Sequence, residues 1–347
     1  MEIIRKFEKL SKNDVGLAGG KGASLGEMTN AGILVPGGFV VLSEVFDRFI
    51  EESDLNAEID AALDSVNTED INSVEEASEK IQGMIINSKM PGDIGEEIVN
   101  SFGDLDAKFV AVRSSATAED SASAAWAGQL NTYLNTTSKD LLENVKKCWA
   151  SLFTPRAIVY RYEKNLHQEK VSVAVVVQKM VESEISGIAF SVHPVTQDRN
   201  HIIIEAGLGL GEAIVSGQVT PDSYVIDKQD WHIIDINVNE QTRALYRAKD
   251  MDNVSKDSEG NNEWKDLGVD GEKQFLNEDD IVELGKLIGK IEDHYGFPVD
   301  VEWAREGGNF YITQSRPITT LTGIDAVEGG EGDESSDSNE DLKKNVV

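Results

Sequence analysis

Oxygen-donor side chains recur along one short segment, from Val299 to Arg316, whose sequence is V-D-V-E-W-A-R-E-G-G-N-F-Y-I-T-Q-S-R. We predict two strands here, joined by a tight turn at Glu306-Gly307-Gly308-Asn309. Because the side chains of a strand alternate between its two faces, Asp300 and Glu302 should point the same way. The return strand should add three side chains to one common face, namely Ile312, Gln314 and Arg316.

The polar face of this hairpin could bind a metal ion and a phosphate. The two carboxylates and the carboxamide of Gln314 are hard oxygen ligands suited to Mg²⁺, which also keeps waters and takes phosphate oxygens as ligands. The planar fork of Arg316 matches a phosphate. The alternative is a solvent-facing hairpin with a surface ion pair, because charged faces are common and such pairs contribute little.

A second candidate is Lys21, inside the glycine-rich stretch G-G-K-G-A-S-L-G-E-M at residues 19–28. An apolar helical pattern follows it. A glycine-rich turn at the start of a helix lets backbone N–H groups approach an anion, and Lys21 would add a full positive charge there. The stretch does not have the Walker A form, and taken alone it fits a plain helix-entry turn equally well.

Arg113 is the third cationic candidate, because it ends the short apolar strand that begins at Phe109. A strand end is a suitable position for a phosphate-binding arginine. The small and hydroxylated residues from Thr117 to Gly128 come next and predict a loop that can close over a ligand. A simple linker is the alternative, although loops of this length inside compact domains are usually functional.

The elements that must position these residues follow from sequence periodicity. The β-branched run from Val171 to Val181 predicts a strand covered on both faces. Residues 53–104 predict acidic helices, and residues 279–295 have the period of an amphipathic helix. A second glycine-rich turn, at 207–217, lacks the Rossmann form. Short strands are expected at 186–191, 202–206, 223–226 and 231–237, and residues 250–277 are predicted to be rich in loops.

The composition favours some partners and excludes others. The chain has 347 residues, 40% of them hydrophobic, and a formal charge of -31 from 63 acidic and 32 basic residues. Nucleic acids and anionic membranes bind basic surfaces, so we expect neither as a partner. A polyphosphate ligand would need a concentrated local basic site. The segment 323–347, rich in Glu, Gly, Ser and Asp, is predicted to be a disordered acidic tail.

Cys148 is the only cysteine, so no disulfide can form within the chain, as is typical of a reducing compartment. It lies in a helical pattern and is expected to be a buried hydrophobe rather than a nucleophile. No apolar run reaches membrane-spanning length, and the N-terminus lacks the layout of a signal peptide. These features predict a cytoplasmic protein.

Several stretches now come together: G-G-K-G-A-S-L-G-E-M at 19–28, V-R-S-S-A-T-A-E-D at 112–120, A-G-Q-L-N-T-Y-L-N at 127–135, G-L-G-L-G-E-A-I-V-S-G-Q-V-T-P-D at 207–222, and D-V-E-W with I-T-Q-S-R-P at 300–317. Over about residues 1–322 the chain resembles the N-terminal ATP-binding domain of the phosphoenolpyruvate synthase and pyruvate phosphate dikinase family. Rifampicin phosphotransferases and plant glucan water dikinases share this domain.

The resemblance implies an α+β fold of the ATP-grasp type, with the nucleotide held between two lobes. The N-terminal lobe would be residues 1–177, with the lysine and arginine segments and the lid. The C-terminal lobe would be residues 178–322, with the adenine-binding strand, the second glycine-rich loop and the metal hairpin. The family uses ATP and Mg²⁺, which become the expected cofactors.

The resemblance also implies roles for individual residues. Those expected to act on the phosphates as catalytic and binding residues are Lys21, Arg113 and Arg316. Those expected to hold Mg²⁺ are Asp300, Glu302 and Gln314. The strand facing the adenine would be formed by Gln178, Met180 and Val181, and the ribose hydroxyls would bind either Glu182 or Glu184. The lid over the phosphates would run from Thr117 to Gly128.

One part of the family pattern is missing from this sequence. The family passes phosphate to a histidine in a loop of the T/S-H-A type on a swivelling domain, and then to a separate acceptor domain. None of the five histidines lies in such a loop, namely His167, His193, His201, His232 and His294. We therefore expect a kinase of the dikinase type that is incomplete without a separate chain carrying the histidine and acceptor domains.

Three functional hypotheses follow. The first is an ATP-binding subunit of a phosphoenolpyruvate synthase, passing a phosphoryl or pyrophosphoryl group from Mg-ATP to a histidine on another chain. The second is a nucleotide-binding regulatory module without catalysis. The third is a self-contained ATP-grasp ligase with a soluble acceptor. Because a fold does not fix a function, an ATP domain like that of rifampicin phosphotransferases or glucan dikinases remains a further alternative.

Overall fold

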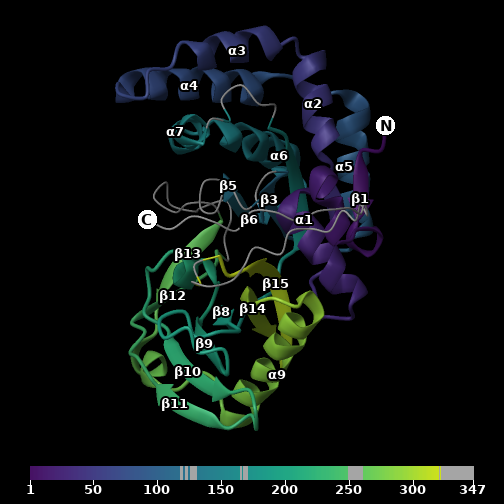
Figure 1. Ribbon diagram of the computed structural model, residues 1–347. Coiled ribbons are helices and arrows are strands. Elements are labelled where there is room, and N and C mark those ends of the chain that lie inside the picture. The colour runs from purple at the N-terminus through teal and green to yellow at the C-terminus, as the bar shows by residue number, and fades with distance from the viewer. Residues whose placement is uncertain are drawn as a thin grey trace, which may run out of the picture.

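Two antiparallel sheets with helices packed against them form the molecule (Figure 1). The computed structural model describes residues 1–117, 120–121, 124–125, 131–164, 166, 171–248, 261–319 and 321. One hydrophobic cluster runs through both sheets within these residues. The mixture of helices and antiparallel sheets confirms the predicted α+β class. The predicted acidic tail at 323–347, and Gly128 of the predicted lid, lie outside the described residues.

The N-terminal sheet has the strand order β1-β2-β7-β3-β6. Its central strand is β7, and the residues Val173–Val177 are fully buried within it. The five strands are β1 (Ile4–Lys6), β2 (Gly38–Val41), β7 (Val173–Lys179), β3 (Val110–Ala116) and β6 (Thr132–Thr136). A β-branched run that pairs on both edges and is buried this completely is what the sequence predicted for residues 171–181.

Helices cover both faces of this sheet, as two neighbouring serines of β3 show. Ser114 and Ser115 point to opposite faces because they are adjacent in a strand. Ser114 Oγ lies 2.9 Å from Ser151 Oγ, directly after α6 (Leu141–Ala150). Ser115 Oγ instead accepts a hydrogen bond from Gly22 N of α1 (Val15–Asn30) at 3.3 Å. The two helices therefore lie on opposite faces.

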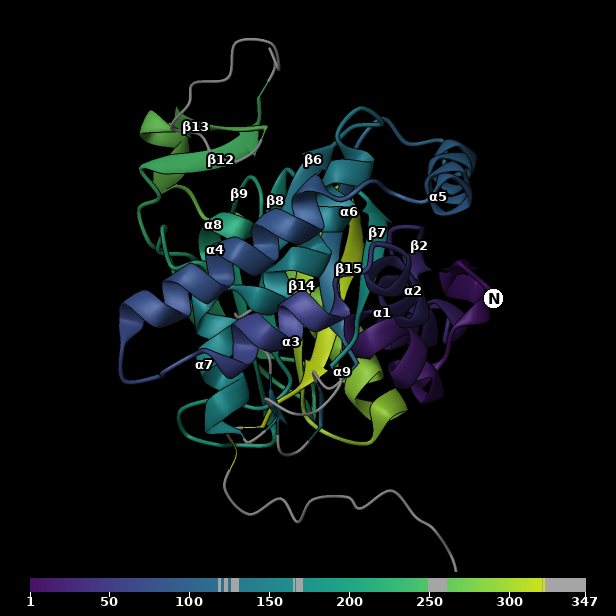
Figure 2. The same ribbon diagram turned by 90° about the horizontal axis from the view of Figure 1, so that it is seen from above.

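The remaining helices of the N-terminal part form further layers (Figures 1 and 2). Contacts join α4 to α3, α6 and α7, so these helices lie beyond α6 and away from the sheet. The helices predicted within 53–104 are confirmed as α3 (Asn56–Asp64), α4 (Ile71–Asn87) and α5 (Gly92–Asp104). The other helices of this part are α2 (Ser43–Glu52), which contacts β7, and α7 (Pro155–Glu163).

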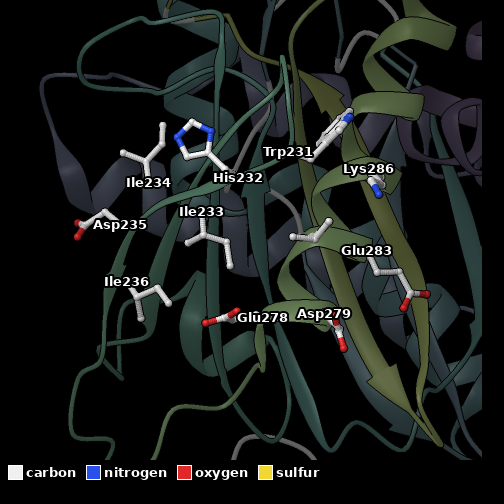
Figure 3. A pocket seen from close by; sticks show the side chains of 11 residues that line it. Trp231, His232, Ile233, Ile234, Asp235, Ile236, Glu278, Asp279, Glu283 and Lys286 are labelled. Atoms are coloured by element: carbon white, nitrogen blue, oxygen red, sulfur yellow. The ribbon is translucent and has the colours of Figure 1, made fainter.

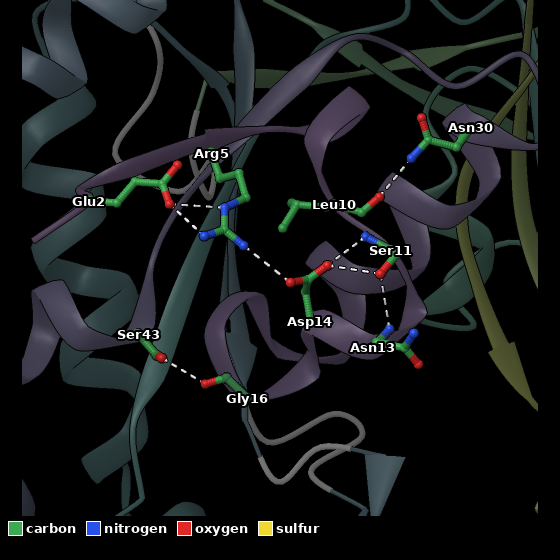
Figure 4. A network of polar contacts seen from close by, with 9 residues as sticks. All are labelled: Glu2, Arg5, Leu10, Ser11, Asn13, Asp14, Gly16, Asn30 and Ser43. Carbon is green, nitrogen blue, oxygen red and sulfur yellow. Dashed lines mark hydrogen bonds and ion pairs between the residues drawn. The ribbon is translucent and has the colours of Figure 1, made fainter.

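A polar network fixes the start of α1 (Figure 4). The carboxylate of Asp14 accepts hydrogen bonds from the backbone N and the Oγ of Ser11, at 2.8 and 2.9 Å, and from Arg5 at 3.1 Å. Ser43 Oγ donates to the carbonyl of Gly16 at 2.9 Å and joins the helix to α2. Because these contacts hold α1 at its first turn, the position of the glycine-rich stretch that follows is well determined.

The glycine-rich stretch breaks α1 rather than beginning it. Gly19 has φ 67° and ψ 172°, so the regular helix is interrupted there and resumes at Gly20. A Cβ atom on Gly19 would lie 2.2 Å from Ser115 Oγ, so only glycine allows both this backbone conformation and this approach to β3. The helix thus starts earlier than the sequence predicted, while Lys21 still lies in a first helical turn.

The C-terminal sheet has the order β11-β10-β9-β8-β14-β15, and every neighbouring pair is antiparallel. The amphipathic helix α9 (Glu278–Tyr295) packs against it, with Asn277 capping its start and Gly296 in the left-handed region at its end. The strands are β11 (Ile233–Asn237), β10 (Asp222–Asp227), β9 (His201–Leu208), β8 (Ile185–Phe190), β14 (Val299–Glu306) and β15 (Asn309–Pro317).

Smaller elements complete the description. The short helix α8 (Glu212–Val215) lies within the second glycine-rich segment, 207–217. The hairpin of β12 (Arg243–Arg247) and β13 (Asn262–Asp266) was not predicted, because β13 lies in the polar stretch 250–277. Within the predicted lid, β4 (Asp120–Ser121) pairs with β5 (Ala124–Ala125). Among the described helices, none is long and apolar enough to cross a membrane.

Candidate functional site

The predicted hairpin exists and is formed by β14 and β15. Its two turn residues, Gly307 and Gly308, both have positive φ, 58° and 84°, as in the type I′ turns that match the twist of paired strands. Directly opposite residues of an antiparallel pair share a face. The register that brings four polar side chains to one face pairs Asp300 with Arg316 and Glu302 with Gln314.

A β-bulge in this hairpin corrects one prediction. The register shifts after Glu302, so that Trp303 pairs with Ile312 and Thr313 is the extra residue. Ile312 therefore shares the apolar face of Trp303, where both are buried, and the prediction that it lies with Gln314 was wrong. A bulge leaves its extra residue out of the regular ladder, and the carbonyl of Thr313 is bonded instead by an arginine from the other sheet.

That arginine is Arg113, which joins the two sheets at this hairpin. Its Nη1 donates to the carbonyl of Thr313 at 2.8 Å and to Gln178 Oε1 at 3.1 Å. Its Nη2 donates to Gln314 Oε1 at 2.5 Å and lies 3.4 Å from Glu302 Oε2. Arg113 is 7% exposed. One buried cation therefore contacts two of the three predicted metal ligands.

Arg113 does not lie at a strand end, as the sequence suggested. It is the fourth residue of β3, which continues to Ala116. Its side chain shares a face with that of Ser115, since residues two apart in a strand point the same way. This is the face against which α1 and β15 pack. Arg113 therefore reaches the β14–β15 hairpin from the middle of β3.

The second arginine of the site pairs with the other predicted carboxylate. Arg316 contacts Asp300 Oδ2 through Nε at 2.8 Å and through Nη2 at 2.7 Å. The side chain of Arg316 is 46% exposed, whereas that of Asp300 is only 12% exposed. Burial raises the pKa of Asp300, although Arg316 acts in the opposite direction. Because Arg316 is half exposed, it can reach an incoming anion, provided that another cation replaces it beside the buried carboxylate of Asp300.

Sequence reasoning missed a third acidic residue beside this site. Glu302 pairs with Ile188 of β8, and Ile188 pairs with Glu205 of β9, so Glu205 shares the face of Glu302. Burial raises the pKa of Glu205, and the nearby charge of Asp300 raises it further. The available signal was a lone charged residue in the apolar run I-I-I-E-A.

Lys21 lies in the part of α1 that contacts both β3 and β15. The backbone N of Gly22 donates to Ser115 Oγ, two residues from Arg113. Ser24 Oγ donates to the carbonyl of Ser315, next to Gln314, at 2.9 Å. The chain around Lys21 is thus held between the strands of Arg113 and Gln314, and the three predicted phosphate-binding segments meet in one region.

Gln178 is a buried polar residue whose side-chain amide is only partly hydrogen-bonded within the described part of the chain. It is 2% exposed, and its Oε1 accepts the hydrogen bond from Arg113. Its Nε2 is buried and makes no hydrogen bond to any group in the described part of the chain. Leaving a buried amide N–H₂ without an acceptor is unfavourable, and an acceptor on a bound ligand would satisfy this atom.

A cavity of about 430 Å³ adjoins the connection between the two sheets. Of the residues predicted to surround the base and ribose, it is lined by Val181, Glu182 and Glu184. Met180 instead packs against the small apolar cluster of Leu210, Ala213 and Leu245. The sequence did not predict the other residues that line this cavity, which are Asn135, Ser183, Leu210, Tyr246 and Arg247.

A larger hollow of about 820 Å³ lies elsewhere, between β11 and α9 (Figure 3). Figure 3 shows Asp279 and Glu283 of α9 on one side and the residues from Ile234 to Ile236 on the other. It contains none of the predicted site residues, and its carboxylates disfavour a polyanion. The smaller cavity is therefore the better candidate for a nucleotide.

The donor set fits Mg²⁺ together with phosphates rather than a metal held by protein alone. Among the described residues, no group of three or more His, Cys, Asp or Glu side chains is placed to hold a metal ion. Asp300, Glu302 and Gln314 supply two carboxylates and one carboxamide. Mg²⁺ is commonly bound through one or two carboxylates plus substrate phosphates and waters, so this small set is sufficient in kind.

Of the predicted lid, Thr117, β4 and β5 lie within the described residues. Thr117 donates through its N and its Oγ1 to the carbonyl of Ser172, at 3.2 and 3.1 Å, which ties it to the approach to β7. It makes no described contact with Arg113 or the hairpin. Gly128 lies outside the described residues, so the lid stays a prediction.

Comparison with known proteins also indicates a nucleotide-binding domain. Residues 15–335 match the family described as pyruvate phosphate dikinase, AMP/ATP-binding domain. A probable phosphoenolpyruvate synthase of Archaeoglobus fulgidus is 47% identical over 320 residues, which cover 90% of this chain and 41% of the relative. A phosphoenolpyruvate synthase of Pyrococcus furiosus is 41% identical over 92% of this chain and 44% of the relative.

A third relative, a probable phosphoenolpyruvate synthase of Methanocaldococcus jannaschii, is 43% identical over 92% of this chain but only 27% of its own length. The chain therefore spans less than half the length of these curated relatives. Its sequence match extends over nearly all of the two sheets described above. The chain belongs to the family defined by the pyruvate phosphate dikinase AMP/ATP-binding domain.

Proposed function

We propose that this chain is the ATP-binding phosphotransferase part of a phosphoenolpyruvate synthase of the dikinase type. The observation that carries the proposal is the set of contacts of Arg113. One buried guanidinium joins Gln178 of the N-terminal sheet to Glu302, Thr313 and Gln314 of the C-terminal sheet. A cation, oxygen ligands and an unbonded amide are thereby gathered between the two sheets, where an ATP-grasp fold holds its nucleotide.

In this proposal the N-terminal lobe is residues 1–177 and the C-terminal lobe is residues 178–322. Lys21, Arg113 and Arg316 bind the phosphates of ATP. Phosphoryl transfer depends mainly on positioning and on neutralising charge, and these three cations come from three separate segments. They offset a triphosphate in a chain whose formal charge is -31.

Mg²⁺ would be held by Asp300, Glu302 and Gln314 and would supply positive charge that neutralises the phosphates. The side-chain oxygens of Asp300, Glu302 and Gln314 now accept contacts from Arg113 and Arg316. Phosphates would offer the two arginines new acceptors, so that the carboxylates and the carboxamide can turn to the metal. The charge-assisted fork of arginine matches phosphate as well as carboxylate.

The base and ribose would occupy the cavity at Val181–Glu184. Backbone groups after β7 would read the base, and Glu182 or Glu184 would accept hydrogen bonds from the ribose hydroxyls. Gln178 Nε2, at the inner end of this segment, would find its acceptor on the nucleotide. Thr117 and Gly128 would belong to the lid over the phosphates.

The proposed acceptor of the phosphoryl or pyrophosphoryl group is a histidine on a swivelling domain, followed by pyruvate on a further domain. The names of the relatives and the length that this chain does not cover support both. The residues proposed here orient the phosphates and stabilise their charge, and the histidine supplies the nucleophile. Cys148, buried and unpaired, fits a reducing compartment, so we propose that the reaction takes place in the cytoplasm.

Transfer of label from radioactive ATP to a separately expressed histidine-domain protein tests this function. The expected result is Mg²⁺-dependent labelling of the histidine, lost in the Lys21→Ala variant. ATP binding without any transfer to a cognate histidine domain would instead support a regulatory module. ATP turnover with a small soluble acceptor alone would support an ATP-grasp ligase.

A further inference from the structure

The β12–β13 hairpin connects the C-terminal part of the chain to the N-terminal sheet (Figure 1). Asn135 of β6 donates through Nδ2 to Asn262 Oδ1 at 2.6 Å, and its carbonyl accepts from Asn261 Nδ2 at 3.0 Å. Asn135 and Asn262 are both buried, and Asn262 also bonds Glu212 of α8 at 3.3 Å. The hairpin is thus fixed on both sides of the 430 Å³ cavity.

The second glycine-rich turn supports this hairpin. Gly209 has φ 85°, and a Cβ atom there would lie 2.4 Å from the carbonyl of Leu245 in β12. The same carbonyl accepts a hydrogen bond from Leu210 N at 2.8 Å. Glycine is needed for both the backbone conformation and the close approach. The glycine at position 209 is therefore explained by its contact with β12.

Arg247, the last residue of β12, projects over the rim of the cavity. Its Nη2 lies 2.6 Å from Glu182 Oε2, and its guanidinium is 4.1 Å from the centre of the Phe109 ring. Phe109 directly precedes β3 of the N-terminal sheet, and its carbonyl accepts from Met180 N at 3.1 Å. Arg247 therefore touches the N-terminal sheet region and the segment proposed to read the nucleotide at the same time.

These contacts are better suited to positioning than to stabilising the fold. The side chains of Arg247 and Glu182 are 29% and 51% exposed, and partly exposed ion pairs contribute little to stability. An arginine that is held by an aromatic ring and by a fixed hairpin, however, restricts the rotamers of the carboxylate it contacts. The carboxylate keeps a second oxygen available, because one carboxylate can accept several hydrogen bonds.

We propose that Arg247 is a positioning residue for nucleotide recognition, and that it holds Glu182, rather than Glu184, ready to accept hydrogen bonds from the ribose hydroxyls. This inference rests on the proposed function, since it assigns the cavity at Val181–Glu184 to the nucleoside of ATP. It adds a recognition element, the β12–β13 hairpin, that closes the nucleoside end of the site against Phe109.

The test compares three probes, ATP, 2′-deoxy-ATP and inorganic tripolyphosphate, by calorimetry on the full chain with Mg²⁺. In Arg247→Met, we expect ATP to bind at least about tenfold more weakly, as for one lost charge-assisted contact. The preference of the wild type for ATP over 2′-deoxy-ATP should disappear, while tripolyphosphate binds unchanged. The matched control is Arg243→Met, because Arg243 lies on the same strand and stacks on Trp264 at 4.2 Å, outside the cavity lining.

Glu182→Gln provides a second test that does not depend on Arg247. It should also abolish the preference for ATP over 2′-deoxy-ATP, and the double variant should lose no more than either single variant, because the two residues act together. The inference is overturned if Arg247→Met keeps the wild-type preference, or if Glu184→Gln loses it while Glu182→Gln keeps it. Failure of the wild type to bind ATP would overturn the proposed function itself.

Discussion

Replacing Arg113 by methionine tests the junction between the two sheets. The change keeps an unbranched apolar stem and removes every donor, so the carbonyl of Thr313 and the Oε1 atoms of Gln178 and Gln314 lose their shared cation. Each buried acceptor left without a donor costs about 1–3 kcal/mol. Because the three share one site that water can partly enter, we expect a total of about 3–5 kcal/mol, as for other buried ion pairs that lose one partner.

The same variant should bind Mg-ATP more weakly. One lost charge-assisted contact of about 1.5–3 kcal/mol lowers affinity roughly 10- to 100-fold. At a ligand concentration of about 100 times the wild-type Kd, ATP stabilises the wild type by about 2.7 kcal/mol, and it should stabilise the variant by only about 0.4–1.4 kcal/mol. Thermal unfolding with and without Mg-ATP measures both effects in one experiment.

Arg305→Met is the matched control. Arg305 forms a partly buried ion pair, 2.9 Å from Asp280, and its side chain lies outside the proposed site. It should lose stability and keep the full increment of stabilisation by ATP. If Arg113→Met showed the wild-type increment, Arg113 would be a structural arginine only and the assignment of the phosphate site would be wrong.

Three further predictions concern single residues. Gly19→Ala should destabilise the protein by several kcal/mol and weaken ATP binding, because a Cβ there would lie 2.2 Å from Ser115 Oγ; an unchanged unfolding temperature would contradict this. Asp300→Asn should abolish Mg²⁺-dependent activity. The unfolding temperature of this variant, measured relative to that of the wild type, should increase as the pH rises from below 3.8 to neutrality. Burial raises the pKa of Asp300 above that ordinary value, so the wild type loses stability as this carboxyl ionises, whereas the amide of the variant does not ionise. A difference in unfolding temperature that stays constant across pH would refute this prediction. Native Cys148 should resist alkylation at neutral pH, since burial raises the pKa of its thiol to about 12, and modification without unfolding would contradict the buried position.

The sequence predicted those elements whose pattern is local. The β-branched run of β7, the turn at Gly307-Gly308 and the amphipathic helix α9 each follow from residues that are close together in the chain. The two faces of β14 also followed from simple alternation. These predictions needed no knowledge of which strands pair across the sheet.

Features that depend on distant contacts could not be predicted. The bulge at Thr313 is set by how β15 pairs with β14, and it reverses the face of Ile312. The extension of β3 beyond Arg113 is stabilised by pairing with β7 through Ala116. The contact of Arg247 with Phe109 joins residues that are far apart in sequence, and the short strands of its hairpin lie in polar stretches with no clear period.

The most direct test of the central claim is a crystal structure with Mn²⁺ and a non-hydrolysable ATP analogue, in which anomalous scattering locates the metal. We expect the metal to be bound by oxygens of Asp300, Glu302 and Gln314, with the phosphates contacted by Lys21 and Arg113. A metal and triphosphate bound anywhere else, for example between β11 and α9, would contradict the proposed site.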